Sequence, residues 1–172
     1  QDKGQALIGE LGRAAQLKLM NGVPHQVMTL AVWHTASLGI DVWLSAIAWG
    51  AEQVLVLTTD EEAPQYLDGL QAQMDVAQAL LNGLGYSGTH FKLLRARSTQ
   101  DLDHALQNLQ QTTQRVPKTA ARFAMAPEKR STLELALDHL IAQSPLKEAD
   151  RPEAIALPAA SPLGAVVVDK AR

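Results

Sequence analysis

Apolar residues recur along the chain with two alternating spacings, one typical of helices and one typical of buried strands. Helical spacing extends over residues 5–19, 38–50, 67–84 and 98–109. Short, nearly continuous apolar runs at residues 26–33, 53–57 and 90–96 predict strands that are covered on both faces. The clearest helical stripe advances in steps of three and four: Leu67, Leu70, Met74, Ala77, Leu81 and Leu84.

Strands that alternate with helices of this length predict parallel pairing through crossover connections. We therefore predict an α/β fold over residues 1–115, a doubly wound, mostly parallel sheet with helices on both faces, flavodoxin-like or Rossmann-like. An added helical segment, residues 116–143, completes an α/β domain of residues 1–143. Residues 144–172 are expected to form an extended strap, because four prolines interrupt them: Pro145, Pro152, Pro158 and Pro162.

Composition excludes several classes of protein. The 172 residues suit one domain, and an apolar fraction of 47% is too high for a disordered chain. Fifteen Lys and Arg against 18 Asp and Glu give a net charge of −3 without a basic stripe, so a nucleic-acid partner is not expected. No apolar run is long enough for a membrane span, and we expect a cytoplasmic protein.

The chain has no cysteine, so it has no disulfide, no catalytic thiol and no thiolate-held zinc or iron–sulfur cluster of its own. It also begins at Gln1 without a signal peptide and stops soon after the β-like run at residues 165–168. We expect a segment excised from a longer polypeptide; a final edge strand with an ordinary C-terminus is the alternative.

Polar residues follow each predicted strand, at the edge where open α/β sheets bind ligands. The candidates for a ligand crevice are His34, Thr35 and Ser37, then Thr58, Thr59 and Asp60, then Arg97 and Ser98. Helix N-termini at this edge would favour an anion. The alternative is that these residues only cap the helices that follow.

Motifs that would identify a cofactor or a reaction are absent from the sequence. The turn after the first predicted strand, HTASLG, lacks a G-x-G-x-x-G fingerprint, and the next turn, TTDEEA, has three carboxylates that would repel a phosphate. No two histidines have the spacing that places metal ligands on one helix face, and no serine lies in a G-x-S-x-G elbow. We predict no metal site and no catalytic set; His34 is the single histidine at a predicted strand end.

One stretch of the chain resembles a known family. Ile40-Asp41 opens an apolar helix, residues 50–57 (GAEQVLVL) lead into a polar turn, and a long helix ends in residues 80–85 (LLNGLG) before the next strand. This pattern is similar to the delta-subunit domain of methyl-viologen-reducing hydrogenase, an electron-transfer partner of heterodisulfide reductases and ferredoxins. That family has cysteines where this chain has residues 34–35 and 58–60, so the chemistry of those cysteines is not implied here.

A second resemblance lies near the end of the chain. Residues 164–169 (GAVVVD) resemble the β-segment that precedes the first cluster cysteine of bacterial [4Fe-4S] ferredoxins. Together the two resemblances imply the middle α/β domain of a bacterial ferredoxin-type iron–sulfur protein. The domain would be a non-catalytic scaffold that docks a redox partner protein, with no cofactor of its own and with [4Fe-4S] clusters in flanking ferredoxin modules. The strap at residues 144–172 would lead to such a module.

Two other functions remain open. The polar crevice would suit a small-molecule or nucleotide-binding domain, or an enzyme, that uses His34, Thr58 and Arg97. Alternatively, the exposed side of the helix at residues 67–84 would form a homo-oligomer.

Overall fold

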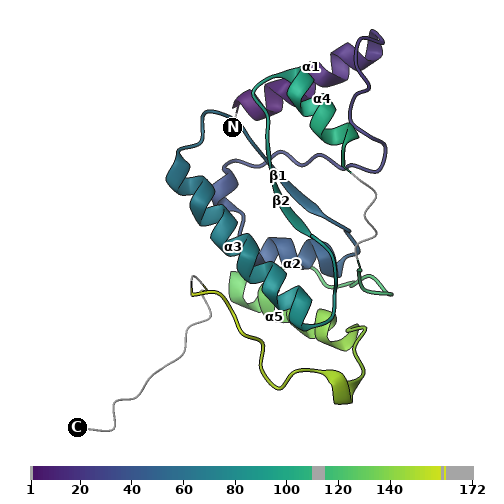
Figure 1. Ribbon diagram of the computed structural model, residues 1–172, viewed down its shortest axis with the longest axis vertical. Coiled ribbons are helices and arrows are strands. Elements are labelled where there is room, and N and C mark those ends of the chain that lie inside the picture. The colour runs from purple at the N-terminus through teal and green to yellow at the C-terminus, as the bar shows by residue number, and fades with distance from the viewer. Residues whose placement is uncertain (1, 110–114, 160, 162–172) are drawn as a thin grey trace, which may run out of the picture.

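A computed structural model describes residues 2–109, 115–159 and 161 (Figure 1). The described part of the chain is a mixed α/β structure that is mostly helical. Its elements in chain order are α1 (Asp2–Gln16), the 3₁₀ turn η1 (Thr35–Ser37), α2 (Ile40–Ala48), β1 (Val54–Thr58), α3 (Pro64–Gly83), β2 (Phe91–Arg95), α4 (Thr99–Gln107), α5 (Lys129–Ala142) and the 3₁₀ turn η2 (Glu148–Asp150).

The sheet is a parallel pair of strands joined through α3. β1 and β2 pair in register from Val54 opposite Phe91 to Thr58 opposite Arg95. The amide of Ala96 then donates to the carbonyl of Thr58, which extends the pairing by one bond at the carboxyl end (3.0 Å). The predictions of strands at residues 53–57 and 90–96 and of their parallel pairing are confirmed.

Helices cover both faces of this small sheet, as predicted. On one face, Leu57 and Leu94 pack in a cluster with α1 and α4. On the other face, Val56 and Leu93 pack in the larger cluster with α2, α3 and α5, whose centre is the fully buried Trp43. Figure 1 shows α1 and α4 together above the strands and the remaining three helices below and beside them. This layering follows from the alternation of side chains along each strand.

The stripe predicted on the third helix is buried as expected. Leu70, Met74, Ala77 and Leu81 of α3 are all less than 4% exposed. Beyond the first turn, which exposes Pro64 and Tyr66, the exposed positions of the helix are polar or lack a side chain, as Asp68, Gly69 and Gln71 illustrate. The apolar stripe therefore stabilises the core of the domain, and the outer side of α3 presents polar groups.

The prediction of a strand at residues 26–33 is wrong. These residues form neither helix nor strand, and they cross from α1 to η1 as an irregular stretch (Figure 1). Met28, Leu30 and Trp33 are exposed. A strand exists only when its main chain finds a partner, and the part of the chain that the structure describes supplies partners only to β1 and β2. Within residues 2–109, 115–159 and 161, the sheet therefore has two strands instead of three or more.

A carboxylate ties the turn after α1 to α4. Asp103 accepts hydrogen bonds from the Nδ2 of Asn21 (2.9 Å) and from the amide of Gly22 (3.0 Å). Partial burial raises the pKa of Asp103, but these hydrogen bonds outweigh it, and the pKa lies below its usual value. The bonds fix where the stretch at residues 26–33 begins.

The last helix and the strap lie against the α2–α3 side of the core. The buried Tyr86 hydroxyl donates to the carbonyl of Leu140 in α5 (2.8 Å). Along the strap, Ile155 and Leu157 pack on the larger cluster, and Leu146 contacts Gly85. The described part of the strap is irregular apart from the 3₁₀ turn η2, and apolar side chains anchor it to the core.

The β-like run at residues 165–168 lies outside the described residues. None of the helices in the described ranges combines the length and apolar character needed to cross a bilayer.

Candidate functional site

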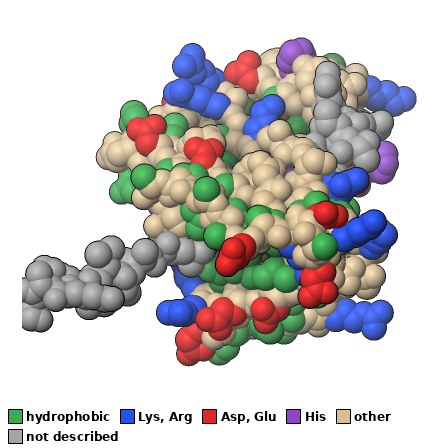
Figure 2. Space-filling model, turned by 60° about the horizontal axis from the view of Figure 1, so that its bottom comes forward, with side chains coloured by type: hydrophobic (Ala, Val, Ile, Leu, Met, Phe, Trp, Pro, Cys, Tyr) green, Lys and Arg blue, Asp and Glu red, His purple; other side chains and the backbone are tan. Residues whose placement is uncertain are grey.

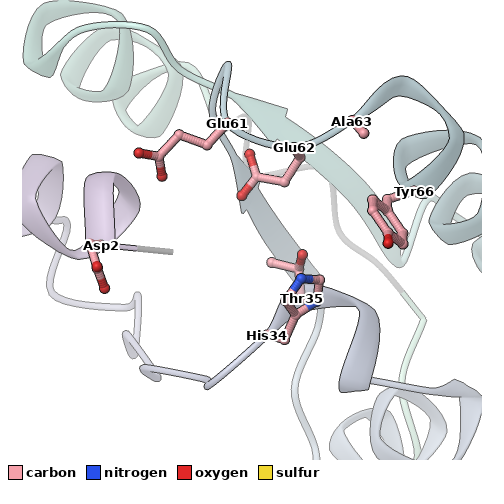
Figure 3. Close-up of a pocket in the computed structure, with 7 residues that line it drawn as sticks. All are labelled: Asp2, His34, Thr35, Glu61, Glu62, Ala63 and Tyr66. Carbon is pink, nitrogen blue, oxygen red and sulfur yellow. The ribbon is translucent and has the colours of Figure 1, made fainter.

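An open hollow lies at the carboxyl edge of the sheet. Its volume is about 350 Å³, and four segments surround it: the start of α1, the residues that enter η1, the turn after β1, and the first turn of α3. The lining residues are Asp2, His34, Thr35, Glu61, Glu62, Ala63 and Tyr66. Figure 3 shows Glu61 directed toward the side of Asp2, and Glu62 folded back along the turn after β1, with Thr35 and His34 on the opposite side of the hollow.

The turn after β1 is closed by its own side chains. Thr59 is 1% exposed and donates to the Glu62 carboxylate twice, from its amide (2.6 Å) and from its hydroxyl (3.0 Å). The same hydroxyl accepts from the amide of Glu61 (3.2 Å). These bonds hold both glutamates at the hollow, because each is linked to a buried threonine at the end of a strand.

Asp60 lies outside the lining of the hollow. Its carboxylate forms an ion pair with Lys3 of α1. The hydrogen bond from Lys3 is the main reason that the pKa of Asp60 lies below its usual value, and its own amide and the more distant Arg97 act in the same direction. Asp60 therefore fastens α1 to the turn after β1, and this position brings Asp2 to the hollow.

His34 and Tyr66 form the aromatic wall. Their rings meet edge to face, with centroids 5.9 Å apart and an interplanar angle of 72°. The Ser37 hydroxyl donates to the carbonyl of His34 (2.6 Å), and Thr35 is 8% exposed. Ser37 thus shapes the turn that presents His34, and Thr35 forms part of the floor.

Arg97 and Ser98 belong to the N-terminal cap of α4. The Ser98 hydroxyl accepts from the amide of Asp101 (3.1 Å), and the Asp101 carboxylate accepts from the amide of Arg97 (3.2 Å). Arg97 and Ser98 therefore cap the helix, which agrees with the alternative that these residues are caps and not ligand-binding groups.

The structure therefore brings together only part of the predicted crevice. His34 and Thr35 line the hollow, while Thr59 and Asp60 position the residues that do. Thr58 is buried beneath the edge, Ser37 lies in η1, and Arg97 and Ser98 cap α4.

Sequence reasoning missed five of the lining residues: Asp2, Glu61, Glu62, Ala63 and Tyr66. The signal for Glu61 and Glu62 was present, since both follow a predicted strand, but only their repulsion of phosphate was considered. Asp2 and Tyr66 reach the hollow through the packing of α1 and α3, which no local pattern reveals.

The electrostatic character of the hollow is acidic. Asp2, Glu61 and Glu62 contribute carboxylates, and the lining residues that the structure describes include no Lys or Arg. Among the residues that the structure describes, no group of three His, Asp or Glu side chains could hold a metal ion. By contrast, the face that bears the strap and α5 shows acidic and basic side chains interspersed with hydrophobic ones (Figure 2). The hollow is therefore suited to cationic groups and not to phosphates.

Comparison with known proteins leaves the family open. No family model, no curated protein and no solved structure matches this chain.

Proposed function

We propose that this chain is a non-catalytic docking and scaffold domain of an iron–sulfur electron-transfer protein. The [4Fe-4S] clusters would lie in flanking ferredoxin modules, and a redox partner protein would bind at the carboxyl edge of the sheet. The proposed architecture is a flavodoxin-like or Rossmann-like layer, of which β1, β2 and the five helices are the described part.

The observation that carries this proposal is the acidic lining of the hollow. This edge of an α/β sheet is where ligands usually bind, and phosphate-bearing cofactors need amide donors or cations there. Here the turn after β1 donates its Thr59 amide to Glu62, and the first turn of α4 donates an amide to Ser98. Donors that the chain has already satisfied do not bind a phosphate, whereas the carboxylates attract a basic protein surface.

Two features of the sequence support the iron–sulfur context. The first is the resemblance of residues 34–96 to the delta-subunit domain of methyl-viologen-reducing hydrogenase. The second is the resemblance of residues 164–169 to the segment that precedes ferredoxin clusters. With no cysteine in the chain, clusters of this kind would have to be held elsewhere.

The test uses the protein that carries this domain together with its proposed cluster modules. Metal analysis should find iron, and its absence would overturn the iron–sulfur context. Electron transfer from the dithionite-reduced protein to a basic acceptor, cytochrome c, should then slow as salt is raised. Glu61→Lys should lower the low-salt rate by about three- to tenfold and leave the high-salt rate nearly unchanged.

The matched control is Glu134→Lys on α5, which makes the same change of charge at an exposed helix position. It should leave the rate unchanged at every salt concentration. Equal effects of the two variants would show that the hollow has no special part in docking.

A small-molecule site is the second candidate, because 350 Å³ is within the range of ligand pockets and an aromatic wall is present. A thermal-shift panel of flavins, nucleotides, phosphate and organic amines separates the two functions. A ligand at a hundred times its Kd stabilises by about 2.7 kcal/mol. That stabilisation raises the Tm by roughly 5–10 °C for a domain of this size. The docking function predicts unchanged melting curves across the panel.

A further inference from the structure

The stretch at residues 26–33 carries the three most exposed large apolar side chains of the described residues. Met28 is 82% exposed, Leu30 78% and Trp33 90%. Within the described part of the chain, no hydrogen bond reaches the main chain or side chains of residues 28–33. Bare amides and carbonyls next to large apolar side chains form a template for pairing with another strand.

The same stretch has the composition of a strand and carries no charge. Its sequence, QVMTLAVW, contains no Asp, Glu, Lys or Arg. Valine, threonine and tryptophan favour strands, which is why the sequence alone predicts one here. The segment therefore has the capacity to pair but no pairing partner in the described ranges of the chain. Two copies of an uncharged segment meet without like-charge repulsion.

We infer that residues 27–33 pair antiparallel with the same residues of a second copy of this chain, around a two-fold axis at Leu30. Pairing the whole segment with itself places its midpoint, Leu30, opposite its own copy. Val27 then lies across from Trp33, a β-branched and aromatic pair of the kind that stabilises antiparallel strands. Met28 lies across from Val32 on the neighbouring positions.

The exposed area is sufficient for a dimer. Trp33 alone offers about 200 Å² in each copy. With Met28, Leu30 and the paired main chains, the contact buries on the order of 1,000 Å², the lower bound for a specific interface. The partner is thus another copy of this chain. This dimer uses the main chain and apolar side chains of residues 27–33 and does not require the docking function of the acidic hollow.

The absence of cysteine in the chain makes the pairing directly testable. Antiparallel partners have Cα atoms about 4.5–5.5 Å apart, which is within the range that a disulfide spans. Leu30→Cys should therefore form a disulfide-linked dimer under mild oxidation. The control, Leu19→Cys, replaces a leucine of similar exposure (73%) in the turn after α1, and it should cross-link at least tenfold more slowly. An equimolar mixture of Thr29→Cys and Ala31→Cys should cross-link faster than either variant alone.

Sedimentation of the 172-residue chain provides the second measurement. The wild type should sediment as a dimer, Leu30→Lys as a monomer, and Leu19→Lys as a dimer, all with the same helical signal in circular dichroism. A monomeric wild type would overturn the inference, as would a Leu30→Lys dimer. A dimer that Leu30→Lys dissociates but Leu30→Cys does not cross-link would contradict the two-fold register and with it the proposed interface.

Discussion

The C-terminal end of α3 contacts the strap at Gly83. Because of this contact, Gly83→Ala should destabilise the protein, although a glycine-to-alanine substitution in a helix usually stabilises it. Gly83 is the last residue of α3, and a Cβ at this position would lie 2.6 Å from Cγ1 of Ile155 and 2.7 Å from its Cδ1 and Cγ2. In a helix, replacing glycine by alanine normally stabilises by roughly 0.5–1 kcal/mol. Here the whole Ile155 side chain would have to move, since three of its atoms are too close.

The magnitude follows from two opposing effects. Forcing an extra methyl group into a packed contact costs about 2 kcal/mol. The helix propensity of alanine returns about 1 kcal/mol, so Gly83→Ala should lower the free energy of unfolding by about 1 kcal/mol. Ile155 is only partly buried, and Ile155→Ala alone should cost about 1 kcal/mol. With the isoleucine removed, Gly83→Ala should stabilise by roughly 0.5–1 kcal/mol.

Urea unfolding of the four proteins in this double-mutant cycle measures the effect. The coupling free energy between the two positions should be about 2 kcal/mol. Gly69→Ala is the matched control, because Gly69 lies in the same helix and a Cβ there would have no neighbour within 4 Å. Gly69→Ala should stabilise in both backgrounds. If Gly83→Ala stabilises the wild type as much as Gly69→Ala does, the strap does not lie on the end of α3.

Three further outcomes are expected from unfolding experiments. Burial raises the pKa of Tyr86 to about 12, so its hydroxyl remains a donor to Leu140 at neutral pH, and Tyr86→Phe should cost about 1–2 kcal/mol; no change in the urea midpoint would refute this role. Burial lowers the pKa of His90, so the unfolded chain binds the proton more readily. The free energy of unfolding should be at its full value above about pH 6.5 and should fall as the pH decreases below that value. In urea midpoints measured from about pH 7 to about pH 5, His90→Gln should make this fall smaller. Ser98→Ala removes the acceptor for the Asp101 amide and should cost about 1 kcal/mol, whereas Ser98→Asp should retain most of the stability.

Local patterns predicted the helices and the paired strands well. The stripe on α3 follows from periodicity alone, because side chains three and four residues apart lie on one face whatever surrounds the helix. The cap at Ser98 is equally local, since the hydroxyl and the amide that it binds are three residues apart. Parallel pairing of β1 and β2 follows from the single helix between them, which carries the chain back to the same end of the sheet.

The candidate site was only half predictable. His34 and Thr35 lie where the edge of an α/β sheet should place polar residues. Asp2 reaches the same hollow because Lys3 pairs with Asp60, an ion pair between residues far apart in the chain. Tyr66 reaches it because α3 starts beside the turn after β1. Ser98 does not line the hollow, because its hydroxyl caps the helix that follows it in the sequence.

The amino-acid sequence by itself determined where helices form, which faces they bury and which cofactor motifs the chain lacks, because these properties depend on neighbours a few residues away. Only the tertiary structure decided that residues 26–33 find no strand partner among the residues that the structure describes, and that carboxylates from α1 and the turn after β1 gather in one acidic hollow. Main-chain pairing and charge clustering depend on residues brought together from distant parts of the chain, so a segment with every local feature of a strand remains unpaired until such a partner is present.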